Sequence, residues 1–189
     1  MKTKFDKINV VDIEATCWEG IGAPREKSEI IEIGICQLDV RTMIIGNRQS
    51  IIVKPEHSDI SQYCTDLTTL TQEKIDKDGI SLESACELIQ IHHETKQYPW
   101  ASWGNYDRRA FEYECKRKQG LGLTIYPFGV DHINVKTLFT LMHRLKKPPE
   151  MSEALKLIGI PLQGTHHRAT DDAYNVAAIL STLIGCCNK

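Results

Sequence analysis

The chain lacks an excess of positive charge. Its 189 residues carry 23 lysines and arginines against 25 aspartates and glutamates, which gives a formal net charge of -2 at pH 7. Proteins that coat nucleic acid in bulk are basic throughout, so the composition excludes that class but not an enzyme that grips a few nucleotides in a local cleft. With 41% hydrophobic and 25% charged residues, the chain has an ordinary globular composition, and its length predicts one domain, residues 1–189.

Long apolar runs are also missing. No stretch approaches the roughly 20 residues that a membrane-spanning helix needs, and the apolar run Ile8–Val11 is broken by Asp12 before it resembles a secretion signal. The seven cysteines are odd in number and contain no C-x-x-C pair, which argues against a disulfide framework or a zinc site. We therefore expect a cytoplasmic protein without membrane contact, in a reducing compartment.

Strand and helix signals alternate along the chain. Apolar and β-branched runs predict strands at residues 8–13, within 29–40 and within 43–55, and the short connection between the last two favours antiparallel neighbours. Two more strands, in "YPWASWGN" and "HINVKT", alternate with helices predicted in "SLESACELIQIHH", "DRRAFEYECKRKQG" (ended by Gly120), "LFTLMHRLKK" (stopped by Pro148), "EMSEALKLIGI" and residues 169–184. This order predicts an α/β fold: a mixed five-stranded sheet, with three antiparallel strands first, flanked by helices.

Two acids lie at the end of the first predicted strand. Asp12 and Glu14 are two residues apart, which places both side chains on one face of a strand. Carboxylates held together repel, so one of them takes up a proton unless a cation lies between them. Mg²⁺ prefers such oxygen ligands, whereas a pair of solvated acids at a strand end is the alternative interpretation.

Two later segments add further candidates. Asp107 follows a predicted strand and opens a predicted helix, where it is either a helix N-cap or a group at the sheet end, where ligands gather in α/β proteins. His167 precedes Asp172 by five positions, and His166 precedes Asp171 by the same spacing. Spacing alone does not choose between these two pairs.

Together these residues suit one chemistry. Two metal ions about 3.5–4 Å apart activate a water and stabilise the departing oxygen in phosphodiester hydrolysis. A histidine whose pKa is about 6.5 is suited to take the proton from that water near neutral pH. No serine or cysteine nucleophile is required.

The motifs resemble those of a known family. Asp12 and Glu14 match its D-x-E block, Asp107 its second aspartate, and His167 with Asp172 its H-x-x-x-x-D block, in the order found in the DEDDh 3′–5′ exonucleases, which have an RNase H-like fold. The resemblance implies that the four acids hold two Mg²⁺ ions, with Mn²⁺ as a substitute. It also implies that His167 is the general base, which favours the pair His167 and Asp172.

Longer segments resemble the Eri-type exoribonuclease branch of that family: "VVDIEATCWEG", "SEIIEIGICQLD", "ISQYCTDLTTLTQEKID" and "HHRATDDAYNVAAIL". In the family, the segment after the first strand receives the terminal nucleotide, which implies substrate binding by Ala15, Thr16, Cys17 and Trp18. Arg168, beside His167, is a candidate for contact with a substrate phosphate.

We therefore expect a metal-dependent 3′–5′ exonuclease that hydrolyses single-stranded nucleic acid, RNA by preference, and releases nucleoside 5′-monophosphates. Three alternatives remain open from the sequence. They are a DNA exonuclease of the proofreading or repair type, a binding module with a nuclease fold, and a phosphatase that acts on small nucleotides. The expected partners are single-stranded RNA or DNA 3′ ends, and the sequence identifies no particular protein partner.

Overall fold

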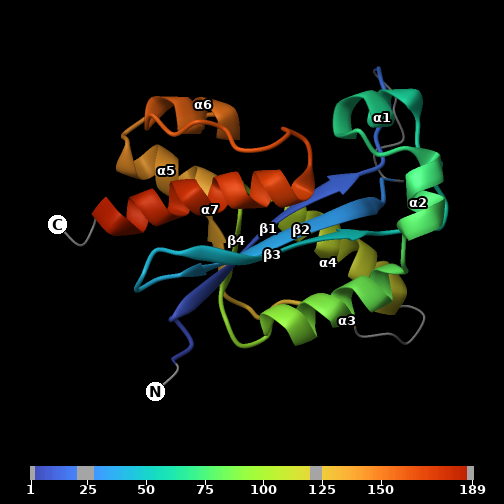
Figure 1. Ribbon diagram of the computed structural model, residues 1–189, viewed down its shortest axis with the longest axis horizontal. Helices are drawn as coiled ribbons and strands as arrows, with labels where there is room; N and C mark the ends of the chain where they lie inside the picture. Colours follow the sequence, from blue (N-terminus) through green and yellow to red (C-terminus); the bar gives the residue numbers. More distant parts are fainter. Residues whose placement is uncertain (1–2, 21–27, 120–124, 187–189) are drawn as a thin grey trace.

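The computed structural model describes residues 3–20, 28–119 and 125–186 (Figure 1). Its strands are β1 (Lys7–Ala15), β2 (Ile30–Asp39), β3 (Ile45–Ile52), β4 (Trp100–Ser102) and β5 (His132–Asn134). Its helices are α1 (Gln62–Thr68), α2 (Gln72–Asp78), α3 (Leu82–His93), α4 (Tyr106–Gln119), α5 (Val135–Met142), α6 (Met151–Leu157) and α7 (Ala169–Cys186).

The five strands form one mixed sheet in the order β3-β2-β1-β4-β5. The pairs β1–β2 and β2–β3 are antiparallel, and the pairs β1–β4 and β4–β5 are parallel. Helix α7 crosses one face of the sheet together with α5 and α6, while α3 and α4 lie on the other face (Figure 1). This arrangement confirms the predicted α/β fold with three antiparallel strands first.

The two faces of β1 belong to different cores. Val10 packs in the cluster that α7 completes, whereas Val11 and Ile13 pack in the cluster beneath α3 and α4. Because side chains alternate along a strand, Asp12 and Glu14 share the face of Val10, towards α7. The carboxyl ends of β1 and β4 lie at the same edge of the sheet, where parallel strands of α/β proteins collect functional groups.

Helix α7 begins in direct contact with β2. A Cβ atom at Gly34 would lie 2.0 Å from the carbonyl carbon of Ala169, so only glycine permits this approach. The contact places the first turn of α7, with its acidic residues, against the centre of the sheet.

Some predicted elements differ from the structure. The helix predicted to run to Pro148 ends at Met142, because Arg144 adopts a left-handed backbone with φ of 52° and turns the chain. Gly120, predicted to end α4, lies outside the described residues, as does most of the loop expected at residues 19–28. The sequence analysis missed α1 and α2, although Ser61 and Thr71 cap them by accepting hydrogen bonds from backbone N–H groups.

Within the described ranges, no helix is long and apolar enough to cross a lipid bilayer.

The buried His93 ties the end of α3 to the sheet. Its Nδ1 lies 3.2 Å from the amide nitrogen of Asn47, and its Nε2 lies 3.0 Å from the amide oxygen of Gln49, which suits a neutral ring. Burial, with smaller contributions from His92 and Lys7, lowers the pKa of His93 to about 4. In the unfolded chain His93 binds a proton below about pH 6.5, whereas in the folded chain it binds one only below about pH 4.

We expect the free energy of unfolding of His93→Gln to fall less between pH 7.5 and pH 5 than that of the wild type. In the wild type, the contribution of His93 is fully present above pH 6.5 and is lost as the pH falls towards 4. Urea unfolding at pH 7.5 and pH 5 measures this difference, with the exposed His57→Gln as the control variant. An identical pH difference in His93→Gln and the wild type would contradict the assignment.

Candidate active site

The four predicted acids, from three elements, meet in one pocket of about 470 Å³, which Glu150 also lines. Strand β1 supplies Asp12 and Glu14, α4 supplies Asp107, and α7 supplies Asp172. Oxygen atoms of Asp12, Glu14 and Asp172 all lie within 4.8 Å of one another. The rest of the lining comes from Ile13, Trp103, Tyr106, His166, His167 and residues 150–152 before and within the first turn of α6.

Asp107 reaches the pocket from the other side of the sheet. It lies within the first turn of α4, so it is not the N-cap that the sequence left open. Its Oδ1 accepts a hydrogen bond of 3.1 Å from the backbone N–H of Ile13, beyond the point where the pairing of β1 with β4 stops. The hydrogen bond fixes a carboxyl group that is only 4% exposed beside the two acids of β1.

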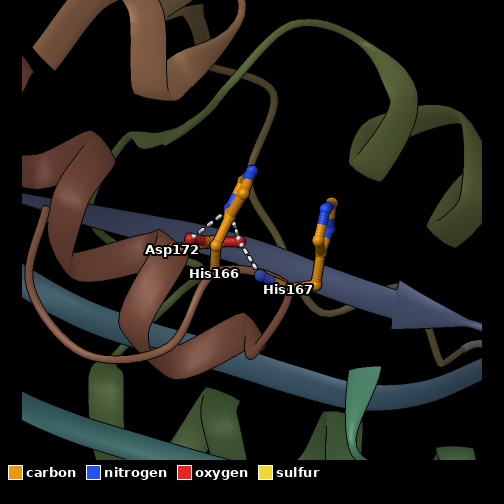
Figure 2. Close-up of side chains that lie close together, drawn as sticks. All are labelled: His166, His167 and Asp172. Carbon is orange, nitrogen blue, oxygen red and sulfur yellow. Dashed lines mark hydrogen bonds and ion pairs between the residues drawn. The ribbon is translucent and has the colours of Figure 1, made fainter. Parts of the chain in front are cut away.

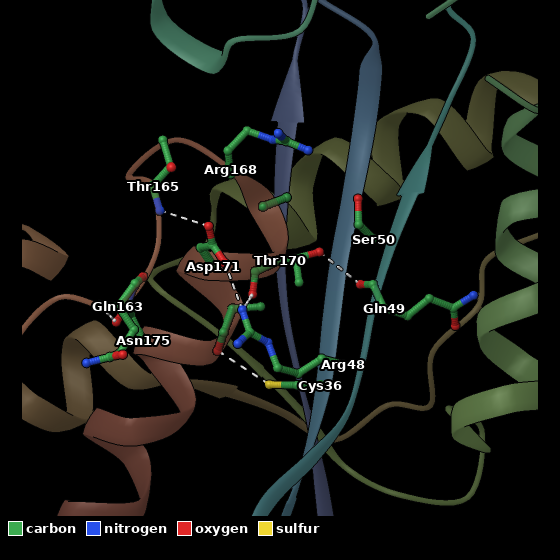
Figure 3. A network of polar contacts seen from close by, with 12 residues as sticks. Cys36, Arg48, Gln49, Ser50, Gln163, Thr165, Arg168, Thr170, Asp171 and Asn175 are labelled. Carbon is green, nitrogen blue, oxygen red and sulfur yellow. Dashed lines mark hydrogen bonds and ion pairs between the residues drawn. The ribbon is translucent and has the colours of Figure 1, made fainter. Parts of the chain in front are cut away.

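The structure separates the two adjacent aspartates of α7. Asp171 turns away from the pocket, where it accepts hydrogen bonds from Arg48 at 2.7 Å and from the backbone N–H of Thr165 at 2.8 Å (Figure 3). Asp172 points into the pocket and is 5% exposed. The spacing in the sequence left both aspartates open, and the packing of α7 on β2 places Asp172 with the other acids.

Both histidines of the loop before α7 line the pocket (Figure 2). The Nδ1 of His166 lies 3.1 Å from a carboxylate oxygen of Asp172, whereas His167 contacts Asp172 through its backbone N–H at 2.8 Å. The two rings stack with centroids 4.0 Å apart. His167 has a left-handed backbone, with φ of 64°, an uncommon conformation for a residue other than glycine. Asp172 holds this turn through the backbone N–H of His167, and its carboxylate also faces the pocket.

Burial and mutual repulsion dominate the electrostatics of the pocket. Burial, and then the charges of Asp107, Glu14 and Asp172, raise the pKa of Asp12 well above its ordinary value. Burial, and then the charges of Asp172, Glu32 and Asp107, raise the pKa of Glu14 to about 8, and burial raises the pKa of Asp107 to about 6. Grouped carboxylates with raised pKa values fit a divalent cation, because an ion bound between them removes the repulsion.

Hydrogen bonds tie the segment that follows Glu14 to neighbouring parts of the fold. The Thr16 side chain is buried and accepts from the backbone N–H of Glu29, while the Cys17 carbonyl accepts from Ser61. Neither Thr16, Cys17 nor Trp18 is among the residues that line the carboxylate pocket. Ala15 lines a neighbouring hollow instead. Substrate binding by these four residues remains a prediction.

Arg168 has a protein partner that the sequence analysis did not foresee. Its guanidinium forms two hydrogen bonds, of 3.0 and 3.1 Å, with the fully buried carboxylate of Glu32 on β2. Glu32 also accepts from the hydroxyl of Ser50 and from the backbone N–H of Ala169. A buried carboxylate needs such partners, so Arg168 anchors the loop of His167 on the sheet. Contact of Arg168 with a substrate phosphate stays a prediction.

Sequence reasoning missed Glu32 altogether. The signal was present, because a single charged residue inside the apolar run "IIEIGI" of a central strand requires a buried partner. It also left out the wall of the pocket formed by Trp103 and the start of α6, since nothing in the sequence links these residues to the acids.

The exonuclease (RNase_T) family profile matches residues 10–180 of the chain. The chain belongs to the exonuclease family. It is 30% identical over 212 residues to human ERI1 exoribonuclease 2, covering 100% of this chain and 30% of that relative. It is 26% identical to human 3'-5' exoribonuclease 1, covering 96% of this chain and 54% of the relative. The chain thus spans less than two thirds of either relative, and these similarities confirm the expected Eri-type resemblance.

Solved structures share the fold of this chain. The nuclease domain of 3'hExo, described as a DEDDh family member bound to rAMP, superimposes with a TM-score of 0.82 at 24% identity, covering 98% of this chain and 95% of that one. Cell-death related nuclease 4 superimposes with a TM-score of 0.80 at 23% identity, covering 97% and 65%. The RNase H-like fold of the exonucleases is therefore confirmed, and the family implies divalent metal ions at the carboxylates.

We expect Asp172→Asn to abolish the binding of Mn²⁺ that calorimetry detects in the wild type. The variant removes one of the three carboxylates that would face the cation, Asp12, Glu14 and Asp172. Asp171→Asn is the matched control, because it changes the neighbouring residue outside the pocket and should bind Mn²⁺ like the wild type. Equal loss of binding in the two variants would contradict the separation of the aspartates.

We expect Arg168→Met to lower the free energy of unfolding by roughly 3 kcal/mol, because it leaves the Glu32 charge buried without its partner. The double variant Arg168→Met with Glu32→Leu should recover most of that loss, which urea unfolding measures. If Arg168 contacts a substrate phosphate instead, Arg168→Met will keep its stability and raise only the KM.

Proposed function

We propose that this chain is a metal-dependent 3′–5′ exonuclease that releases nucleoside 5′-monophosphates from single-stranded nucleic acid, RNA by preference. The observation that carries the proposal is the cluster of Asp12, Glu14 and Asp172 oxygens within 4.8 Å, with Asp107 and His167 in the same pocket. A pocket with every residue type that two-metal hydrolysis needs argues against a fold kept only for binding.

The four acids would hold the metal ions, and Mg²⁺ or Mn²⁺ fits because both prefer oxygen ligands. Bound there, the ions supply an activated water and stabilisation of the departing oxygen. The chain fixes these acids from rigid elements: Asp12 and Glu14 from the central strand, Asp107 through its hydrogen bond to Ile13, and Asp172 from the first turn of α7. Positions set by packed elements favour catalysis, since little rearrangement is left for the substrate to drive.

His167 is the proposed general base. Burial, and then the neighbouring His166, lower the pKa of His167, so its ring is neutral at pH 7 and able to accept a proton. His166 suits this role less, because its Nδ1 already faces Asp172. In the part of the chain that the structure describes, no hydrogen bond occupies the ring nitrogens of His167, which leaves them for the attacking water.

The preference for RNA rests on the relatives, whose names describe exoribonucleases. One similar structure is described as "3'-end specific recognition of histone mRNA stem-loop by 3'-exonuclease". It superimposes with a TM-score of 0.81 at 25% identity, covering 96% of this chain and 64% of that one. DNA is the second candidate substrate, because Exonuclease X in complex with 5' overhanging duplex DNA shares the fold, with a TM-score of 0.65 at 19% identity.

A degradation assay tests the proposal. Matched 5′-labelled single-stranded RNA and DNA oligonucleotides are incubated with the protein in Mg²⁺, in Mn²⁺ and in chelator. We expect a ladder that shortens from the 3′ end, faster on RNA, and that disappears in chelator. Activity that survives thorough metal removal would overturn the two-metal mechanism, and faster loss of DNA would overturn the RNA preference.

We expect His167→Ala to lower kcat at pH 7.5 by about 100-fold or more, the usual range for loss of a general base. His166→Ala, the matched control from the same loop, should retain most of the activity. Single-turnover cleavage of a labelled oligonucleotide compares the two. The reverse order of losses would move the base to His166.

A further inference from the structure

The last residue of β4 carries a buried hydroxyl group. Ser102 is fully buried, and its Oγ lies 3.2 Å from the carbonyl oxygen of Gly104 and 2.9 Å from Nε2 of His132. His132 is the first residue of β5, which pairs with β4 in parallel. The two strands thus bring an imidazole next to the turn that leads from β4 into α4.

One assignment of protons satisfies the Ser102 hydroxyl. The carbonyl oxygen of Gly104 only accepts hydrogen bonds, so Ser102 donates its single proton there, and its Oγ accepts from the Nε2–H of His132. Burial, and then the charge of Arg108, lower the pKa of His132 to about 4, so the ring is neutral at pH 7. The hydrogen bonds therefore assign the one ring proton of His132 to Nε2.

The turn that Ser102 holds carries two groups of the active site. Gly104 has φ of 102°, a conformation that favours glycine, and its N–H donates to the carbonyl of Ser102 at 3.0 Å. Trp103, inside this turn, lines the carboxylate pocket, and Asp107 follows in the first turn of α4. Burial raises the pKa of Asp107, and the Ser102 hydroxyl opposes part of that rise. A carboxylate also only accepts, so a proton shared with Asp107 leaves the same demand on His132.

His132 acts on the site through Ser102 and not by direct contact. In the part of the chain that the structure describes, His132 is not among the residues that line the carboxylate pocket, and it lines a hollow of about 680 Å³ beside α4 instead. Its ring lies against Trp100, with the centroids 4.2 Å apart. Packing against Trp100 needs a flat ring, whereas the contact with Ser102 needs a hydrogen-bond donor. Substitutions can therefore separate the two roles.

We propose that His132 is a positioning residue of the active site, because its Nε2–H orients the Ser102 hydroxyl and so fixes the turn before α4. That turn sets the positions of Asp107 and Trp103 at the carboxylate pocket. Catalytic groups act only within a narrow range of geometry, so a small displacement of Asp107 slows the reaction. The inference rests on the proposed function, since its effect is measured on hydrolysis at the four acids.

Two substitutions of His132 separate the donor from the ring. His132→Phe keeps a flat ring without a donor, and His132→Gln keeps an N–H at the same number of bonds from the backbone as Nε2. On a single-stranded RNA octamer in Mg²⁺, we expect His132→Phe to lower kcat by about ten-fold, the equivalent of one hydrogen bond, with KM within about two-fold of the wild type. His132→Gln should recover most of the kcat. His57→Phe, at a side chain that is 65% exposed, is the control and should match the wild type.

A double variant tests whether His132 acts through Ser102. Ser102→Ala should lower kcat by a similar factor, and adding His132→Phe should cause little further loss, because the hydroxyl that His132 orients is already absent. Losses that multiply in the double variant would overturn the proposal. So would a wild-type kcat in His132→Phe, or a kcat of His132→Gln as low as that of His132→Phe.

Nitrogen NMR of the isotope-labelled wild type tests the contact without an activity assay, with His132→Gln to assign the ring signals. The proposal requires a protonated Nε2 and an unprotonated Nδ1 in His132 at pH 7. A proton on Nδ1 instead would overturn it, even where a variant fails to fold. A wild type that has the Nε2 proton but hydrolyses no RNA would overturn the proposed function, and the role of His132 with it.

Discussion

Repulsion among buried carboxyl groups is the constraint on which the site depends. Asp12, Glu14, Asp107 and Asp172 share one pocket. Burial raises the pKa values of the first three, and the charges of neighbouring carboxylates add to the rise for Asp12 and Glu14. Such a cluster costs folding free energy unless protons or cations neutralise it. The rest of the chain must therefore hold the acids at distances from which unconstrained side chains would move apart. A divalent cation that binds between the acids removes their repulsion and so stabilises the folded chain.

Three contacts hold the acids together. Gly34 admits the first turn of α7 onto β2, the ion pair between Arg168 and Glu32 anchors the loop before α7, and Ile13 fixes Asp107 through its backbone N–H. Each contact joins segments far apart in the sequence. The acids of β1 lie on the most central part of the sheet, so small shifts of α4 or α7 would change the distances between all four carboxylates.

The sequence predicted the sheet and the candidate acids because local patterns carry both. Alternating apolar runs mark strands, and the D-x-E spacing places two side chains on one face whatever surrounds them. It did not separate Asp171 from Asp172, which depends on how α7 rotates against β2. The sequence also did not reveal that Arg168 pairs with the buried Glu32, because the two residues lie 136 positions apart in the sequence. Tertiary partners of this kind leave no local signal.

The central claim is that the fold forces these acids together for a metal. The most direct test measures the free energy of unfolding of the wild type and Asp12→Asn by urea titration at pH 8, in chelator and in Mg²⁺. The account predicts that Asp12→Asn is more stable than the wild type in chelator, because one repelling charge is gone, and that Mg²⁺ stabilises the wild type far more than the variant. A variant that is less stable in chelator and equally stabilised by Mg²⁺ would contradict the account.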